Sequence, residues 1–211
     1  EARRGWDIRS ELPGINFRAE QQIDLLMKLG ASFSEECQWS YLPSTDSTEF
    51  YLQNPSFGYG CAASTHCMIR YARPRTVVEI GSGMSSRVIA KALAKNCLED
   101  GKVSDYIIVD PYHGETIQNG LGGVSELVAK RVELTDLAFW ERLKANDILF
   151  IDSGHCVRIG GDVNYLFLEI LPRLTPGVII HIHDINLPYE YPRVYATSET
   201  FRQFWTEQYL L

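Results

Sequence analysis

Short runs of apolar residues recur along most of the chain, and longer amphipathic stretches separate them. Four of these runs carry a carboxylate at or next to their last residue; they are Thr76–Ile80, Tyr106–Asp110, Asp147–Asp152 and Val178–His183. Short apolar runs that are bounded by turn residues and separated by helical patterns predict buried parallel strands. A less regular run over Glu126–Glu133 predicts one more strand, the third in chain order.

The stretches between these runs carry apolar residues at helical spacing. They predict a short helix near Thr116 and longer helices over Arg18–Leu29, Cys61–Tyr71, Met84–Asn96, Leu137–Leu143, Gly161–Leu174 and Ser198–Leu211. Pro172 lies in the last turn of the helix at Gly161–Leu174 and should end or kink it, because proline has no N–H to donate. The Ser-, Thr-, Pro- and Gly-rich segment Tyr41–Gly60 predicts a loop.

Strands that alternate with helices are typical of an α/β protein with a parallel sheet. We therefore expect a Rossmann-like, doubly wound and mostly parallel sheet with helices on both faces. Residues 57–211 would form this domain, and residues 1–56 would form an N-terminal extension of helix and loop that carries no recognisable motif.

The turn after the first predicted strand is the most informative segment of the chain. An acid, Glu79, is followed by Gly81 and Gly83 and then by a helix that begins at Met84. Glycine lets the backbone turn tightly and approach a ligand, and the start of a helix offers free N–H groups. Such a turn is typical of a sheet that holds an adenosine-type cofactor, although a tight turn without a ligand is the alternative.

Four segments taken in order resemble the class I S-adenosylmethionine-dependent methyltransferases. They read VVEIGSGMSS from Val77, YIIVDPY from Tyr106, DILFIDSGH from Asp147 and LTPGVIIHIHD from Leu174. The pairing of FIDSGH with LPRLTPGVIIHIHDI resembles a bacterial subgroup that includes macrocin-type sugar O-methyltransferases and cephalosporin-hydroxylase-like proteins. The resemblance covers roughly Phe57 to Pro192 and implies an enzyme of the EC 2.1.1 class.

The resemblance implies S-adenosylmethionine as the cofactor. The residues under its methionine part would be Glu79, Gly81, Ser82, Gly83 and Ser85. Asp110 would bind the ribose hydroxyls, because a carboxylate accepts two donors at once, and Asp152 would also contact the cofactor. Asp136 is a candidate for the adenine pocket, but a cap for the helix at Leu137 is an equal alternative.

The resemblance places the reacting end at Asp152, Ser153, His155, His183 and Asp184. His155 is the predicted general base, with Asp152 and His183 beside it, because imidazole titrates near neutral pH. His181 and His183 alternate with isoleucines and so face the same side of their strand; one of them could be a core histidine. Asp162 would either orient His155 or cap the helix that it begins.

Related O-methyltransferases often bind a divalent metal at the ends of the fourth and fifth strands. Asp152 and Asp184 match those positions, and Mg²⁺ needs only two or three carboxylates because it keeps several waters. A third ligand often follows directly, yet this chain has Ile185 there and Asn186 one residue later. A metal-free site with His155 as the base is therefore the alternative.

The expected acceptor is a hydroxyl group on a small molecule, such as a sugar or a natural product. Two other classes of function stay open: an NAD(P)-dependent oxidoreductase, weakened because Ser86 replaces the third glycine of that fingerprint, and a non-catalytic cofactor-binding or partner protein. Methyltransferases of this class normally end with two further strands. Residues 185–211 read instead as a loop and one helix, so we expect those strands to be missing.

The net charge, the apolar runs and the cysteines indicate which partners and which compartment to expect. The 211 residues carry a net charge of −7, which argues against general binding to nucleic acid or anionic membranes. No apolar run approaches the roughly 18 residues of a membrane helix. The five cysteines show no metal-binding or CxxC spacing, so we expect reduced thiols and a cytoplasmic enzyme. A homo-oligomer is a separate option that the sequence leaves open. Cys156 beside His155 could be a nucleophile or, more commonly, a small apolar filler.

Overall fold

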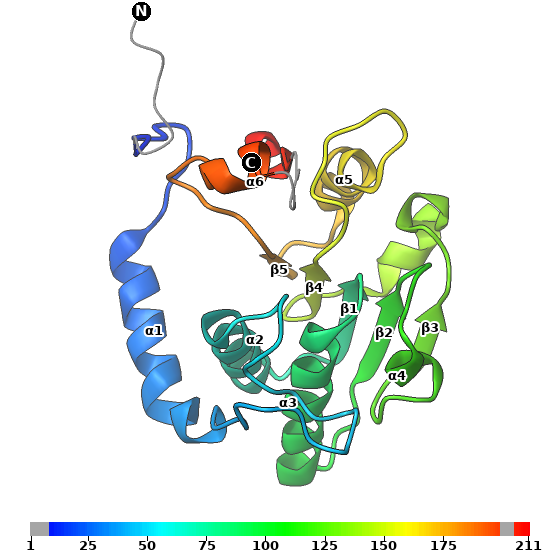
Figure 1. Cartoon of the computed structure of the whole chain (residues 1–211). Coiled ribbons are helices and arrows are strands. Elements are labelled where there is room, and N and C mark those ends of the chain that lie inside the picture. Colours follow the sequence, from blue (N-terminus) through cyan, green and yellow to red (C-terminus); the bar gives the residue numbers. More distant parts are fainter. Residues whose placement is uncertain (1–8, 199–204) are drawn as a thin grey trace, which may run out of the picture.

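A five-stranded parallel sheet forms the centre of the computed structural model, which describes residues 9–198 and 205–211 (Figure 1). The strands are β1 (Thr76–Ile80), β2 (Asp105–Val109), β3 (Glu126–Val128), β4 (Ile148–Ile151) and β5 (Ile179–Ile182). Their order across the sheet is β3-β2-β1-β4-β5, and every neighbouring pair is parallel. The first strand, β1, thus lies at the centre of the sheet, β2 and β3 extend the sheet to one edge, and β4 and β5 extend it to the other. This order confirms the doubly wound α/β fold.

Helices cover both faces of the sheet, because alternate residues of each buried strand point to opposite sides. On one face Val77, Ile108 and Phe150 pack in the same core as residues of α2 and α3. On the other face Val78, Leu149 and Ile151 share a core with residues of η3, α5 and η4. These helices are α2 (Tyr59–Ala72), α3 (Met84–Asp100), η3 (Leu137–Arg142), α5 (Asp162–Asn164) and η4 (Tyr165–Ile170).

Several predicted elements differ in length or type from those observed. The helix predicted over Gly161–Leu174 runs from Asp162 to Arg173, but α5 passes into the π-helix η4 and then into the 3₁₀-helix η5 (Leu171–Arg173). Pro172 lies in that last turn and the helix ends there, as expected. The predicted third strand is shorter than Glu126–Glu133, because a 3₁₀ turn, η2 (Val132–Leu134), takes its end. The segment over 137–142 is a 3₁₀-helix, and α4 (Glu115–Gln118) is the short helix expected near Thr116.

The helix predicted over Ser198–Leu211 is wrong in the part that is described, and residues 199–204 of it lie outside the described residues. Trp205 and Thr206 have no regular structure, and η6 (Glu207–Leu210) is one 3₁₀ turn. The prediction assumed an amphipathic helix with its polar residues towards solvent. The segment instead buries the polar Glu207 and Gln208. A short helix, α6 (Arg193–Thr197), forms in the region that the sequence suggested to be a loop.

β5 lies at one edge of the sheet. No strand follows it in residues 183–198 or 205–211, as expected from the sequence. The side chain of Ile180 is 42% exposed there. Further out, α1 (Ala19–Phe33) buries Leu29 but leaves Leu26 and Met27 largely exposed. The N-terminal segment also contributes Phe50 to the main core, so it does not pack as a separate unit.

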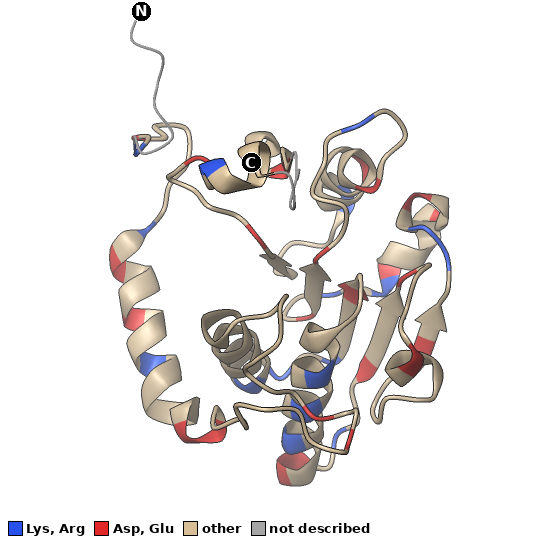
Figure 2. Cartoon of the chain, viewed as in Figure 1, with Lys and Arg blue, Asp and Glu red and all other residues tan. Residues whose placement is uncertain are grey.

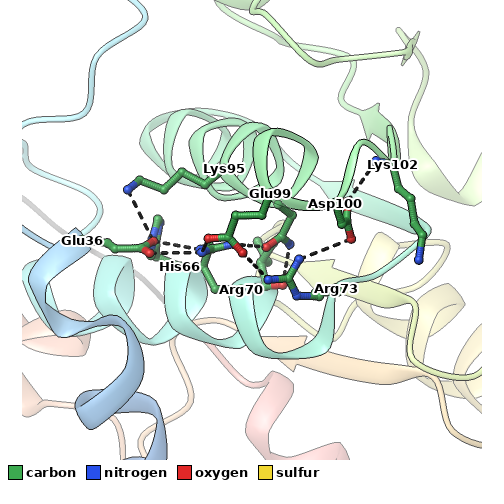
Figure 3. A network of polar contacts seen from close by, with 10 residues as sticks. Glu36, His66, Arg70, Arg73, Lys95, Glu99, Asp100 and Lys102 are labelled. Carbon is green, nitrogen blue, oxygen red and sulfur yellow. Dashed lines mark hydrogen bonds and ion pairs between the residues drawn. The ribbon is translucent and has the colours of Figure 1, made fainter.

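A network of charged side chains fastens the N-terminal segment to α2 and α3 (Figure 3). Arg70 on α2 is 2% exposed and donates two hydrogen bonds to Glu36, from Nε at 2.9 Å and from a terminal nitrogen at 3.1 Å. Arg70 also bonds Asn96 and Glu99 on α3. His66 adds a contact of 2.8 Å to Glu36. The planar guanidinium is needed here because it serves three acceptors at once.

Arg70→Lys should therefore destabilise the protein by about 2 kcal/mol, since one ammonium cannot replace the two parallel bonds to a partly buried carboxylate. Arg73→Lys is the matched control: Arg73 also binds Glu99, but it is 40% exposed, so little stability should be lost. Urea unfolding of both variants measures this, and equal effects would show that burial of Arg70 does not matter.

Gly81 allows β1 and β4 to come together at the point where their chains turn away. Its φ of +87° lies in the left-handed region, and an added Cβ would overlap the carbonyl oxygen of Asp152. Gly83, two residues later, has no atom within 4 Å of the place where its Cβ would lie. Only the first of these two glycines is therefore required by the fold itself.

Gly81→Ala should lower the free energy of unfolding by roughly 2–5 kcal/mol through backbone strain and the clash with the Asp152 carbonyl. Gly83→Ala, the control in the same turn, should stay near wild-type stability. Thermal or urea unfolding compares the two. Equal losses would mean that the whole turn, rather than the close approach at Gly81, limits stability.

Candidate active site

Backbone hydrogen bonds join the carboxyl ends of the central strands. Gly81 N donates to Val109 O at 3.0 Å, Asp152 N donates to Ile80 O at 2.9 Å, and His183 N donates to Ile151 O at 2.9 Å. The residues that leave β1, β2, β4 and β5 are thereby held side by side, and Figure 2 shows acidic segments just beyond β4 and β5. The ends of parallel strands at a reversal of strand order are where α/β sheets bind ligands.

A cavity of about 610 Å³ opens at this edge of the sheet. Volumes of roughly 300–1,000 Å³ are typical of sites for small molecules. Its lining includes five residues predicted for the site from the sequence: Gly81, Ser82, Asp110, Asp152 and Ser153. It also includes Asp162, for which the sequence suggested another role, and Tyr112, Arg131, Glu133 and Arg158, which the sequence analysis did not assign to the site.

Asp110 lies where a ribose-binding carboxylate is expected. Its Oδ2 accepts a hydrogen bond of 2.5 Å from Ser82 Oγ, and its Oδ1 accepts one of 2.8 Å from Tyr112 N. These bonds hold the carboxylate against the glycine turn at the cavity wall. Two of its acceptor positions are used, so further lone pairs of the same oxygens are available to a ligand.

Glu79 lies beneath the turn rather than in the cavity. It is fully buried, and its two oxygens accept hydrogen bonds from Ser85 Oγ at 2.6 Å, Ser86 Oγ at 2.8 Å and the hydroxyl of Tyr106. Burial raises the pKa of Glu79 to about 7, although the three hydroxyls act in the opposite direction. Glu79 and Ser85 thus support the start of α3, and the predicted contact of each with a cofactor stays a prediction.

Asp136 is exposed and does not line the cavity. It directly precedes η3 but makes no capping hydrogen bond from its side chain. The alternative role as a helix cap is therefore wrong in this structure, and the adenine contact stays a prediction. Gly83 is also outside the cavity lining, with open space beside its Cα.

A cluster of two acids and two histidines lies next to the cavity. His155 Nε2 is 3.3 Å from Asp152 Oδ1 and 3.7 Å from Asp184 Oδ2. His183 Nδ1 is 3.3 Å and 3.2 Å from the same two oxygens. The structure thus brings together all the residues predicted to react except Ser153, whose hydroxyl has no hydrogen-bond partner. His155 and Asp184 both have left-handed backbones, with φ values of 55° and 58°, a strain that is concentrated at functional sites in proteins.

The charges in this cluster stabilise one another. Burial lowers the pKa of His155, but Asp152 and Glu207 outweigh this effect and raise it to about 9. The same balance, with Asp152 and Asp184 as partners, holds the pKa of His183 well above its ordinary value. Burial would raise the pKa of Asp152, yet the two histidines hold it below its usual range. The carboxylates of this cluster therefore favour the protonated form of both imidazoles.

Glu207 is the residue of this site that the sequence did not reveal. It lies 52 residues after His155, is fully buried, and its Oε1 is 2.5 Å from His155 Nδ1. Thr206 N and Glu207 N both bond the carbonyl oxygen of His155, and Trp205 packs on its imidazole ring with centroids 4.5 Å apart. This C-terminal segment, which Figure 1 shows beyond the ends of β4 and β5, fixes His155 in place.

Three other residues considered from the sequence, His181, Asp162 and Cys156, have surroundings that do not support a role in the reaction. His181 is half-buried and packs on Phe150 with ring centroids 4.4 Å apart, and burial lowers its pKa to about 4. Asp162 neither caps its helix nor orients His155; its Oδ2 accepts the N–H of Gly154 at 2.5 Å. Burial raises the pKa of Cys156, which is opposite to what a thiol nucleophile needs.

A larger hollow of about 980 Å³ lies at the opposite end of the sheet, beside Thr76, Asp105 and Asp147. These residues stand at the amino ends of the strands. Ligand sites in open α/β sheets lie at the carboxyl ends, and none of the acid–histidine cluster reaches this hollow, so we assign function to the smaller cavity. None of the described helices has the length and apolar character that a membrane crossing requires.

Comparison with known proteins identifies the family. Residues 78–185, half of the chain, match the family described as a methyltransferase domain. The chain belongs to this family. The match runs from β1 to the residue after Asp184 and so contains the cavity and the four residues of the acid–histidine cluster. It favours methyl transfer over the hydride transfer considered from the sequence.

One curated relative adds little on substrate. An uncharacterized protein of Archaeoglobus fulgidus is 30% identical over 142 residues, which are 66% of this chain and 62% of that protein. The chain thus spans less than two thirds of the length of this relative. No solved structure matches the chain.

Glu79→Gln should remove a pH dependence of stability. The pKa of Glu79 is about 7 in the folded protein, above its ordinary value of 4.5, so the folded chain holds this proton more tightly than the unfolded chain. The stabilisation is complete below about pH 4.5 and is lost as the pH rises to about 7. Relative to the Gln variant, the wild type should lose roughly 3 kcal/mol across this window. Urea unfolding at several pH values measures the difference; a constant difference would contradict the shifted pKa.

Proposed function

We propose that the protein is an S-adenosylmethionine-dependent O-methyltransferase that acts on a hydroxyl group of a small molecule. One observation carries the proposal beyond the family: Asp152 belongs both to the lining of the cavity and to the acid–histidine cluster. A cofactor in the cavity would therefore present its methyl group to the cluster. Methyl transfer needs the donor and the acceptor in line. A residue common to the cavity and the cluster would hold the two close to each other.

The residues at the cavity suit the two ends of the cofactor. The Asp110 carboxylate is placed to accept hydrogen bonds from ribose hydroxyls, and Ser82 holds it in that orientation. The turn at Gly81 and Ser82 presents backbone rather than side chain to the ligand. The acidic wall formed by Asp152 favours the cationic sulfonium and ammonium groups of S-adenosylmethionine.

The acid–histidine cluster is the proposed acceptor end. A hydroxyl loses its proton on methylation, and an imidazole or a carboxylate beside it can take that proton. His155 stays the predicted base. Its pKa is raised to about 9, so the share of molecules in which His155 is neutral and can take the proton grows as the pH rises towards that value. A sugar or natural-product hydroxyl is the proposed acceptor class, supported by the resemblance to macrocin-type enzymes.

The function is tested directly by release of S-adenosylhomocysteine from S-adenosylmethionine in the presence of hydroxylated acceptors. Turnover on any of them supports the proposal. Tight binding of NAD(H) and none of S-adenosylmethionine would instead support the oxidoreductase considered above. Binding of S-adenosylmethionine without turnover on a broad acceptor panel would favour a non-catalytic protein.

Asp110→Asn should weaken binding of S-adenosylmethionine by roughly 10- to 100-fold, because the amide retains one acceptor oxygen but loses the charge that binds the ribose hydroxyls. Asp136→Asn is the control, since Asp136 is exposed and outside the cavity. Calorimetric titration with S-adenosylhomocysteine and S-adenosylmethionine measures both. Undiminished affinity in Asp110→Asn, or an equal loss in Asp136→Asn, would place the ribose elsewhere.

A further inference from the structure

We propose that Cys37 and Cys67 are an oxidation site at which the chain forms an internal disulfide bond, with a small-molecule disulfide as the oxidant. The two residues are 30 positions apart in the sequence, yet their Sγ atoms lie 3.7 Å apart. Both are buried, with exposed fractions of 2% and 6%. A disulfide bond is about 2.0 Å long, so the sulfur atoms must approach by roughly 1.7 Å, which rotation about the Cα–Cβ bonds can provide.

The hydrogen bonds of the two thiols leave the sulfur atoms facing each other. The Cys37 thiol donates to the carbonyl oxygen of Phe33, at 3.6 Å. Because a thiol has one proton to donate, the contact between the sulfurs then has Cys67 as the donor and a lone pair of Cys37 as the acceptor. At a separation of 3.7 Å the two sulfur atoms are in direct contact, so no other atom has to leave before they join.

The pair lies in a small core that holds the N-terminal segment on α2. Leu29 of α1 and the two cysteines are the buried residues of this core. The helix α1 adds little to it, since Leu26 and Met27 are 67% and 70% exposed. Segments with few buried apolar contacts open at a lower free energy than the whole protein unfolds. The two thiols are therefore shielded in the closed form and become accessible when this segment opens.

The reaction begins in the opened form. Burial raises the pKa of Cys37 to about 12 and also raises that of Cys67, so neither is a thiolate in the closed form. After opening, one thiolate attacks a sulfur of the small disulfide RSSR, forms a mixed disulfide and expels RS⁻. The second thiolate attacks the protein sulfur of the mixed disulfide and expels the other RS⁻. The two leaving groups take up the two thiol protons, and RSSR gains the two electrons that the chain loses.

The new bond would restrain a long loop that touches the candidate site. Residues 38–58, all of which the structure describes, contain no helix or strand and connect the 3₁₀ turn η1 (Ser34–Glu36) to α2. This loop places Phe50 and Phe57 in the main core. The ring of Phe57 lies 5.0 Å from that of His183, measured between centroids. Oxidation of the pair thus limits the movement of a segment that packs against the acid–histidine cluster.

The proposal does not depend on the proposed function, so its test needs neither cofactor nor acceptor. The full chain is reduced, freed of reductant, incubated with excess oxidised glutathione and then denatured in an alkylating reagent. We expect the number of free thiols to fall by two from the five of the reduced chain. Cleavage after glutamate should release residues 37–49 and 50–79 as two peptides joined by one disulfide, which a reductant separates.

Cys61 provides the matched control, because it lies on the same helix and in the same peptide as Cys67 but outside the small core. Cys61→Ser should still form the bond, and Cys67→Ser should not. The oxidised wild type should melt roughly 5–10 °C above the reduced protein, because the bond limits the freedom of the unfolded chain. Cys67→Ser should show no such difference. If Cys67→Ser does not fold, the peptide maps of the wild type and of Cys61→Ser assign the bond without it.

The proposal fails if all five thiols stay free after long incubation, also in urea just below the unfolding transition, where the segment opens more often. A bond from Cys37 to Cys61, or a glutathione adduct that never gives way to the internal bond, would equally overturn it. An oxidised chain that melts at or below the temperature of the reduced chain would refute the restraint of the loop.

Discussion

The buried carboxyl group of Glu79 makes the interactions on which the turn at the cavity depends. A carboxyl group without contact with water is costly unless hydrogen bonds replace its hydration. Here the hydroxyls of Ser85, Ser86 and Tyr106 do so, and they come from the first turn of α3 and from β2. The same Ser86 hydroxyl also accepts the N–H of Gly83. One side chain on β1 thereby fixes the next strand, the following helix and the glycine turn between them.

Two distinct environments meet at Asp152. On one side lies an open cavity with backbone at its wall, suited to a large polar cofactor. On the other lies a compact cluster in which two imidazoles and two carboxylates compensate one another's charge. The bond from Asp152 N to Ile80 O joins this residue to the end of β1, so both environments are positioned by the central pair of strands. Small shifts between β1 and β4 would alter both at once.

The central features could be predicted from the sequence because they depend on local patterns. The four apolar runs predicted four strands of the sheet, of which β1, β2 and β4 are buried and β5 is partly exposed at the edge. The acids and glycines at the strand ends predicted Gly81, Ser82, Asp110 and Asp152 at the cavity. Glu207 could not be predicted, because its contact with His155 joins residues 52 positions apart and its own neighbours read as an ordinary amphipathic helix. The prediction that Asp162 orients His155 was wrong for the opposite reason. Asp162 is near His155 in the sequence, but its side chain accepts a hydrogen bond from Gly154 N instead. Proximity along the chain predicts which residues share a strand end, not which side chains meet.

The strand order has a consequence for how the chain acquires its fold during synthesis. β1, β2 and β3 form one half of the sheet, and β4 must then return to pair with β1, so that Asp147 caps the amide of Arg75 72 residues earlier. Until β4 is made, the inner edge of β1, with Val77 and Val78, has no partner, and unpaired apolar edges favour aggregation. Pairings between distant segments also slow folding. A nascent chain that ends before Ile148 would therefore need protection by a chaperone more than the finished protein does.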